Sequence, residues 1–328
     1  MFTRRSVLLA AGAATLAGGP RRATGDTGQT LRMGYIFSAQ SHLGAGAAVF
    51  AKEVERRTAG RIRIQQFPDG ALGGDVELAK AVALGTVDLA FINGAGLPTI
   101  APELDIVHIP FLFSDVSHAR AAMDGAIGEE FAQALAAKGL VTLAWGENGL
   151  RHITNSKKPI ATPADLQGLK MRVPQSEVMQ IGFQALGAEA SLLPFPQLFD
   201  ALQSGRFDGE ENPIAVIQSS RFDQVQRFLS MTGHVYDPAV IAMSPDAFAD
   251  LSAADKTAVT EAARLGAKAS RDAAARAEIA GLIALKQAGM QVLETIDRPL
   301  FARAVASANP AFETRFGRGR IERIRAAA

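Results

Sequence analysis

Strands and helices alternate along the first third of the chain, and this alternation limits the possible folds more than any other feature of the sequence. Runs of apolar residues at 31–37, 61–67 and 87–92 predict three strands. Residues with helical periodicity fill the intervals, at about 44–59 and 76–84. Strands separated by helices in this way pair in parallel and are covered by those helices, so the pattern predicts an α/β fold.

A second stretch of the chain follows the same order. The strand after Gly60 and the strand after Gly168 each lead through helical segments to a Gly-x-x-Asp turn and a further strand. Because 328 residues are too many for one ordinary core, we interpret the two units as two lobes of similar construction. Chance similarity between short α/β units is the alternative.

A long helix without proline is predicted from residue 253 to 288, with Ser252 as its N-cap. At ~1.5 Å rise per residue it would be roughly 54 Å long, which exceeds the length of one lobe. We therefore expect this helix to bridge both lobes. The predicted division gives lobe I residues 26–150 and about 236–270, and lobe II residues 151–235 and about 271–328.

The charge of the chain gives no sign of a nucleic-acid partner. Lys and Arg number 34 against 33 Asp and Glu, so the formal net charge is +1. Four of the arginines lie within the first 22 residues, and without them the net charge of the remainder is −3. A faintly acidic body lacks the basic surface that binds a phosphate backbone. There is no cysteine, which excludes disulfides, thiolate nucleophiles and cysteine metal ligands.

The first 25 residues predict an export signal. Arg4 and Arg5 precede a soft Ala/Leu/Gly stretch at 7–19, which is too short to span a bilayer. The segment around the two arginines resembles a twin-arginine signal, and an ordinary Sec signal is the alternative. We expect cleavage between residues 17 and 26, a periplasmic location, and a mature chain that does not insert into the membrane.

No catalytic motif is present, so we predict a protein that is not an enzyme and that carries no cofactor or metal. The five histidines lack metal-ligand spacing, and there is no G-x-S-x-G elbow or phosphate-binding loop. Gly44-Ala45-Gly46 follows a strand as a dinucleotide loop would, but Val49 occupies the position of the third glycine. Absence of a motif leaves an exported enzyme as the less favoured alternative.

Several motifs in the middle of the chain resemble one family of transport receptors. They occur at 147–151 (ENGLR), 154–156 (TNS), 168–174 (GLKMRVP), 186–188 (LGA), 194–195 (PF), 201–203 (ALQ) and 208–213 (DGEENP). Others lie at 67–75, 109–113 (IPFLF) and 231–236 (MTGHVY). As a set they resemble the periplasmic solute receptors of tripartite ATP-independent periplasmic (TRAP) transporters, of the dicarboxylate-receptor type. The likeness covers nearly the whole chain after the signal.

The resemblance implies a two-lobed periplasmic binding protein fold, with mixed sheets, covering helices and a long interlobe helix. In that family the arginine of the Arg-Val-Pro element binds the ligand carboxylate, and here it is Arg172. A guanidinium fork suits this role because it donates two parallel hydrogen bonds to a carboxylate. The alternative comes from the strand itself, in which apolar and basic residues alternate, so that Arg172 would face solvent.

The same resemblance implies further ligand contacts. In the second lobe they are Asn212, Arg151 as a second cation, and Phe195 as a wall of the pocket. The alternatives are an Asx turn, a salt bridge at the rim and a place in the lobe core, respectively. From the first lobe, Gln40 or His42, Glu77 and Asn93 are candidates because they stand at strand-to-helix connections, and Tyr236 either lines the cleft or packs in the core. Glu210 departs from the family pattern, in which glutamine is common, and puts a charge beside the site.

We therefore predict a periplasmic receptor that binds a small organic acid anion and delivers it to the membrane subunits of a TRAP transporter. Closure of the lobes around the ligand would create the form that the membrane partner recognises. A receptor for an ABC importer or a sensor kinase is the alternative. The sequence does not distinguish monocarboxylates from dicarboxylates.

Overall fold

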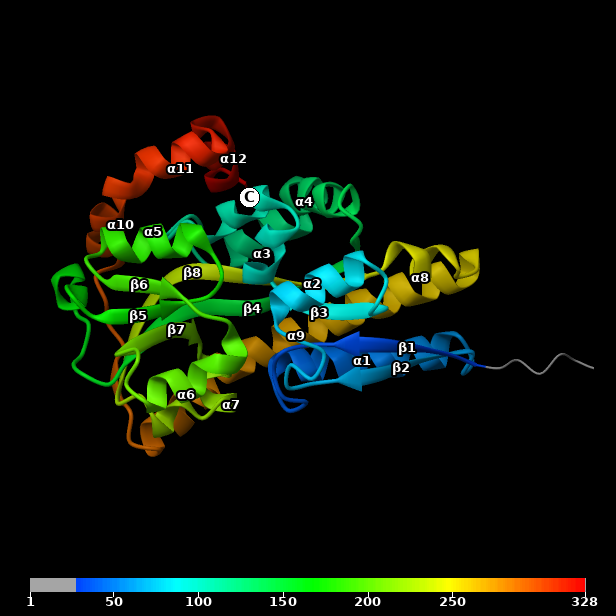
Figure 1. Cartoon of the computed structure of the whole chain (residues 1–328), viewed down its shortest axis with the longest axis horizontal. Helices are drawn as coiled ribbons and strands as arrows, with labels where there is room; N and C mark the ends of the chain where they lie inside the picture. Colours follow the sequence, from blue (N-terminus) through cyan, green and yellow to red (C-terminus); the bar gives the residue numbers. More distant parts are fainter. Residues whose placement is uncertain (1–27, 328) are drawn as a thin grey trace, which may run out of the picture.

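The computed structural model describes residues 28–327, so the predicted export signal lies outside the described residues. A sheet covered by helices forms the body of the protein (Figure 1). Its strands are β1 (Gln29–Gly34), β2 (Ile62–Phe67), β3 (Leu89–Asn93), β4 (Val141–Asn155), β5 (Lys170–Val173), β6 (Glu189–Leu192), β7 (Gly209–Pro213), β8 (Phe228–Met243) and β9 (Gln291–Leu293).

The α-helices connect and cover these strands. They are α1 (His42–Arg57), α2 (Asp75–Ala83), α3 (Val116–Asp124), α4 (Ala126–Ala136), α5 (Glu177–Ala185), α6 (Leu198–Gln203), α7 (Ile214–Ser219), α8 (Pro245–Ala249), α9 (Ala253–Gln287), α10 (Arg298–Val305), α11 (Asn309–Phe316) and α12 (Arg318–Arg325). The first strands and helices fall within a few residues of the ranges that the sequence predicts, because their apolar patterns are strong.

Two long strands, β4 and β8, run antiparallel through the centre and join the two lobes. The first lobe is built around β1, β2 and β3, which pair in parallel, and β3 then pairs antiparallel with β8. The second lobe is built around β5, β6 and β7 on the other side of β4. The order is β2-β1-β3-β8-β4-β7-β5-β6, with β9 on β8, so the sheet is mixed and continuous through both lobes.

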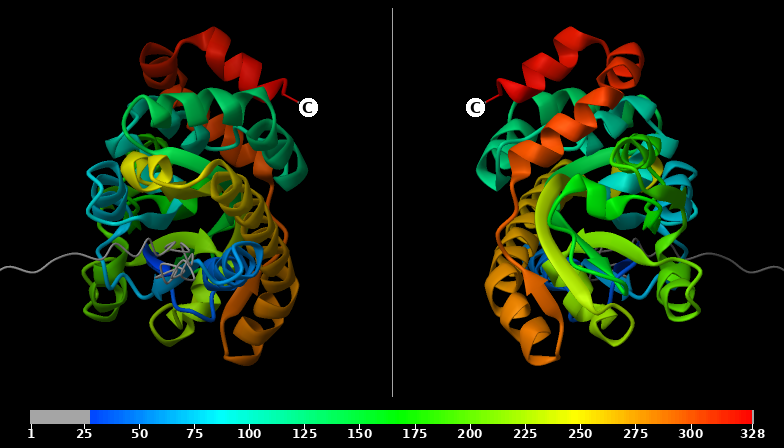
Figure 2. Two further views of the ribbon diagram at one scale, coloured as in Figure 1. Left: turned by 90° about the vertical axis from the view of Figure 1, so that its right-hand side faces the viewer. Right: turned by 90° about the vertical axis from the view of Figure 1, so that its left-hand side faces the viewer.

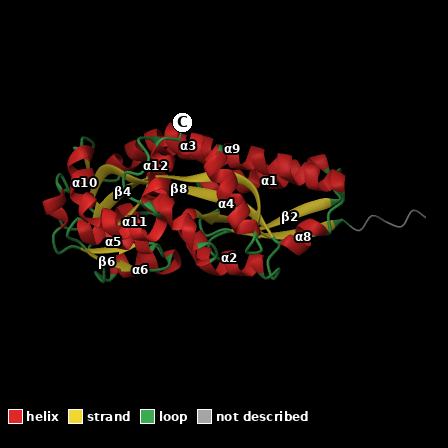
Figure 3. Cartoon of the chain, turned by 90° about the horizontal axis from the view of Figure 1, so that it is seen from above, coloured by secondary structure: helices red, strands yellow, loops and turns green. Residues whose placement is uncertain are grey.

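The long helix α9 lies along one side of the sheet, next to α1 (Figures 2 and 3). Its N-cap is Ser252, whose hydroxyl accepts a hydrogen bond from the backbone N–H of Asp255. The helix contacts α1 in the first lobe, β4 in the centre and α7 in the second lobe, and so bridges the lobes. No helix among residues 28–327 is both long and apolar enough to cross a membrane.

Glycines allow α1 and α9 to approach each other closely. A Cβ atom added at Gly46 would lie 2.7 Å from the carbonyl oxygen of Gly266, and one added at Gly266 would lie 2.8 Å from that of Gly46. Gly46 belongs to the Gly44-Ala45-Gly46 stretch that resembles part of a dinucleotide loop. The structure gives this glycine a packing role, because only a residue without Cβ fits between the two helix backbones.

We expect Gly46→Ala to lower the free energy of unfolding by about 1–3 kcal/mol, since two helix backbones must separate to admit the methyl group. Urea denaturation measures the change. The control is Gly319→Ala in α12, where an added Cβ meets no atom within 4 Å. That variant should be neutral or slightly stabilising, by up to about 1 kcal/mol. Equal stabilities of the two variants would contradict the packing role.

Candidate ligand-binding site

A narrow cleft lies between the two lobes, at the carboxyl ends of β3, β5 and β7. Asp75 and Asn93 line it from the first lobe, and Arg172 and Asn212 line it from the second. The crossing strands β4 and β8 contribute Asn148, Arg151 and Asp237. The empty volume of the cleft is about 240 Å³. Ligands of open α/β sheets bind in such crevices.

Arg172 lies near the end of β5 and is buried, with 2% of its surface exposed. The alternative of a solvent-facing arginine is therefore wrong; it is Lys170, two residues earlier, that is exposed. The Nε of Arg172 donates a hydrogen bond of 2.9 Å to the carbonyl oxygen of Leu193. Within the described residues, its Nη1 and Nη2 atoms form no hydrogen bond and no ion pair. The face of the guanidinium that can hold a carboxylate is thus unpaired.

Burial lowers the pKa of Arg172 from its usual value to about 10, because the charged form has lost hydration. The nearby charge of Glu211 opposes this shift, whereas that of Arg151 adds to it. The pKa remains well above neutrality, so the guanidinium is positively charged at pH 7. An anion bound here would replace the lost hydration.

Arg151, the other arginine of the cleft, donates hydrogen bonds to protein groups from each of its three guanidinium nitrogens. Its Nε and Nη2 donate to the two carboxylate oxygens of Glu211, at 2.5 and 2.8 Å. Its Nη1 donates to Asp237 Oδ2 at 2.9 Å. Burial alone would lower the pKa of Arg151, but the charges of Glu211 and Asp237 raise it. Arg151 therefore belongs to a compensated network, unlike Arg172.

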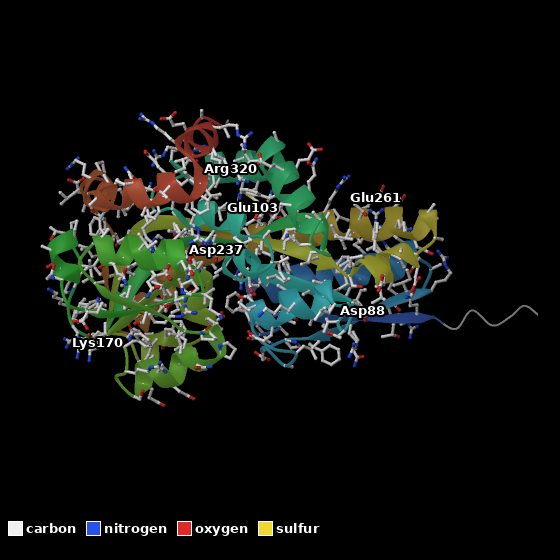
Figure 4. The ribbon with its side chains drawn as sticks, turned by 45° about the horizontal axis from the view of Figure 1, so that its top comes forward. Asp88, Glu103, Lys170, Asp237, Glu261 and Arg320 are labelled. Atoms are coloured by element: carbon white, nitrogen blue, oxygen red, sulfur yellow. The ribbon has the colours of Figure 1, made fainter. Side chains whose placement is uncertain are left out.

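Buried histidines extend this network in both directions. His234 Nε2 lies 3.2 Å from Glu211 Oε2, and His108 Nε2 lies 3.2 Å from Asp237 Oδ1. Asp237 also accepts a hydrogen bond of 2.7 Å from Asn148. Burial would raise the pKa of Asp237, but His108 and Arg151 hold it below its usual value. Asp237 lies in the middle of the molecule, where the lobes meet (Figure 4).

Glu210, the departure from the family pattern, supports Asn212. Asn212 Nδ2 donates to Glu210 Oε2 at 2.5 Å, and Thr154 Oγ1 donates to Oε1 at 2.6 Å. Burial raises the pKa of Glu210 to about 7. Asn212 lines the cleft, whereas Glu210 lies behind it. The carboxyl group that the sequence puts beside the site is therefore hydrogen-bonded to a side chain that lines the cleft.

Phe195 lies across the mouth of the cleft from the first lobe. Its ring meets that of Phe37 edge to face, with the centroids 4.9 Å apart. Both residues line the cleft. This aromatic contact joins the two lobes directly, in a geometry that favours the pair beyond its buried area.

The other sequence candidates do not line the cleft. Gln40 and Glu77 are exposed. His42 is buried and lies 3.2 Å from Asn148, which does line the cleft, and burial lowers the pKa of this histidine to about 4. The hydroxyl of Tyr236 donates to Glu147 at 3.0 Å. Their contact with a ligand stays a prediction that the cleft geometry does not support.

Three polar residues that line the cleft are not among the sequence candidates, namely Asp75, Asn148 and Asp237. Each lies within or directly after one of the motifs. Asp75 is the last residue of the motif at 67–75, Asn148 belongs to ENGLR, and Asp237 follows Tyr236. Asp75 and Glu77 are the two acidic residues in the first turn of α2. Which of them faces the cleft depends on the residue at which the helix begins. α2 begins at Asp75, after the N-cap Gly74.

Comparison with known proteins agrees with this architecture. The family described as bacterial extracellular solute-binding protein, family 7, matches residues 33–314. The chain belongs to this family. A solute-binding protein of Verminephrobacter eiseniae is 43% identical over 305 residues, 93% of this chain and 91% of that one. The 2,3-diketo-L-gulonate-binding periplasmic protein of Escherichia coli is 33% identical over 279 residues, 85% of each chain.

A solved structure extends the likeness to three dimensions. The TRAP periplasmic solute-binding protein from Polaromonas sp. JS666, bound to D-erythronate, has a TM-score of 0.89 and 46% sequence identity. The match covers 91% of this chain and 99% of that one. The predicted fold and class are thus confirmed: this family 7 protein is an extracytoplasmic receptor for a small organic acid that works with TRAP membrane subunits, and its relatives are binding proteins rather than enzymes.

We expect the two cleft arginines to differ in their effect on stability. Arg151→Met leaves Glu211 and Asp237 buried without their cation, and should cost about 3–5 kcal/mol of unfolding free energy. Arg172→Met removes a buried charge that has no ion-pair partner among the described residues, and should leave stability unchanged or raise it. Urea denaturation of the ligand-free receptor, after dialysis, measures both. An equal loss in the two variants would contradict the contrast drawn here.

Proposed function

We propose that the unpaired guanidinium of Arg172 binds the carboxylate of the transported acid inside the interlobe cleft. The observation that carries this proposal is a fully buried arginine whose Nη1 and Nη2 have no partner elsewhere in the described chain. Carboxylates are the groups that complement such a fork, through two short charge-assisted hydrogen bonds. Arg151 is held by Glu211 and Asp237, so it serves as a fixed part of the wall.

The neighbours of Arg172 have supporting roles in this proposal. Asn212 presents its amide to the ligand, in an orientation that Glu210 fixes. Phe195 covers the ligand when it meets Phe37. Asn93 contacts the part of the ligand that lies furthest from its carboxylate.

We further propose that the ligand enters when the lobes separate and that closure encloses it. The cleft is narrow, so a molecule of several carbon atoms requires the walls to move apart. The lobes would be residues 26–150 with about 236–270, and 151–235 with about 271–328. α9, β4 and β8 pass from one lobe to the other and would carry the hinge.

The ligand class and the export route belong to the same proposal. The E. coli relative is named for 2,3-diketo-L-gulonate and the Polaromonas structure holds D-erythronate, so small hydroxy and keto acids are the first compounds to test. We infer that residues 1–25 direct export and are then removed. Mass spectrometry of the exported protein should find an N-terminus between residues 18 and 26.

Arg172→Ala should weaken binding of the carboxylate ligand by on the order of 3 kcal/mol, because a desolvated anion loses its partner. The ligand is first identified by a thermal-shift screen against an organic-acid panel, since binding to the native state raises its melting temperature. Calorimetry then measures affinity. Lys170→Ala is the matched control, because Lys170 is an exposed cation on the same strand (Figure 4). An Arg172→Ala receptor with unchanged affinity would refute the proposal.

A further inference from the structure

The first lobe lines the cleft with an acidic side chain and with hydrogen-bond acceptors, whereas Arg172 on the opposite wall is a cation that donates hydrogen bonds. Asp75 is the first residue of α2, and Asn93 is the last residue of β3. The backbone N–H of Asn93 donates to Asp75 Oδ1 at 3.0 Å, and its side-chain Nδ2 donates to Oδ2 at 3.1 Å. The two side chains therefore form one unit, in which the donors of Asn93 are directed at Asp75.

In this unit one hydrogen-bond acceptor, the side-chain oxygen of Asn93, has no donor. Asn93 is 3% exposed, and its Oδ1 is buried with no hydrogen-bond partner in residues 28–327. A buried acceptor without a donor is unfavourable in a folded protein. Asn93 lines the cleft, so a donor on the ligand can satisfy this oxygen. Asn93 Nδ2 donates to Asp75, so the unpaired group that this amide offers in the cleft is its acceptor Oδ1.

The charge of Asp75 is not compensated by a contact. Within the described chain it forms no ion pair, and Arg172 acts on it only through space, as does the like charge of Asp237. Burial raises the pKa of Asp75 to about 7. At pH 8 the side chain is mostly ionised, and it can then accept hydrogen bonds but cannot donate one.

We propose that Asp75 and Asn93 select ligands that carry hydroxyl groups beyond a single carboxylate, and reject dicarboxylates. A hydroxyl donates to the unpaired acceptors, whereas a second carboxylate brings further acceptors and a negative charge toward Asp75. Among the residues of the described chain that line the cleft, the other cation is Arg151, and its three guanidinium nitrogens already donate to Glu211 and Asp237. This inference rests on the proposed binding of the first carboxylate by Arg172.

Three acids of four carbon atoms test the proposal at pH 8, because they share their chain length and one carboxylate and differ in the groups on the other carbon atoms. D-Erythronate carries one carboxylate and hydroxyls, succinate carries two carboxylates, and butyrate carries one carboxylate alone. Calorimetry of the full receptor should give erythronate the highest affinity, by at least about tenfold over each of the others. Equal or tighter binding of succinate, or failure of erythronate to bind, would overturn the proposal.

Two variants test whether Asp75 is the residue that discriminates between erythronate and succinate. Asp75→Asn keeps the shape of the side chain and removes its charge, and Asp75→Ser removes the charge with a smaller group. Each should lower the erythronate-to-succinate affinity ratio by about tenfold or more. The ratio is measured within one variant, so a partly unfolded sample does not alter it. Asp250→Asn, at an exposed aspartate after α8, is the control and should keep the wild-type ratio.

The Arg172→Ala receptor separates failure of this inference from failure of the proposed function. If Arg172→Ala abolishes binding of all three acids while the Asp75 variants keep the wild-type ratio, the carboxylate site stands and the selection by Asp75 and Asn93 is wrong. If Arg172→Ala binds the acids as tightly as the wild type, the carboxylate site itself is wrong, and the inference fails with it.

Discussion

A buried guanidinium without a carboxylate beside it is unfavourable, because the charge has lost its hydration and gained no partner. Arg172 is in this position, and Arg151 in the same cleft is not. Two arginines of equal burial thus have opposite roles. Glu211 and Asp237 compensate Arg151 and make it part of the framework, while the burial cost of Arg172 remains until an anion arrives. Under the proposed function, the charge of Arg172, which has no ion-pair partner among residues 28–327, makes the cleft specific for anions, while the compensated Arg151 keeps it stable.

The framework around this charge is built to hold two lobes at one cleft. β4 and β8 pass through both lobes, and α9 contacts helices of both. Small residues permit this arrangement: Gly46 and Gly266 bring α1 against α9, as close as two backbones can pack. The His108–Asp237–Arg151–Glu211–His234 network then fixes the polar centre where the lobes meet. The proposed movement of the lobes would therefore be concentrated at the strands and the helix that connect them.

Sequence patterns predicted the elements with strong local signals. The proline-free run after Ser252 predicted α9 to within one residue of its end, and the motif resemblance selected Arg172, Asn212, Asn93 and Phe195, which all line the cleft. Patterns failed where a side chain's direction depends on tertiary packing. The sequence indicates Glu77 and gives no sign of Asp75, because both lie in the first turn of α2. Only the packing of α2 against β3 directs Asp75 toward the cleft. Likewise, nothing local reveals that Glu211 and Asp237, far apart in sequence, converge on Arg151.

A crystal structure of the receptor with the acid identified by screening is the most direct test of the binding site. We predict that both oxygens of the ligand carboxylate lie within hydrogen-bonding distance of Arg172 Nη1 and Nη2, at about 2.7–2.9 Å. The guanidinium should stay close to its present position, held by the carbonyl of Leu193. A structure in which the ligand carboxylate is bound by other groups, with Arg172 turned toward solvent, would contradict the account.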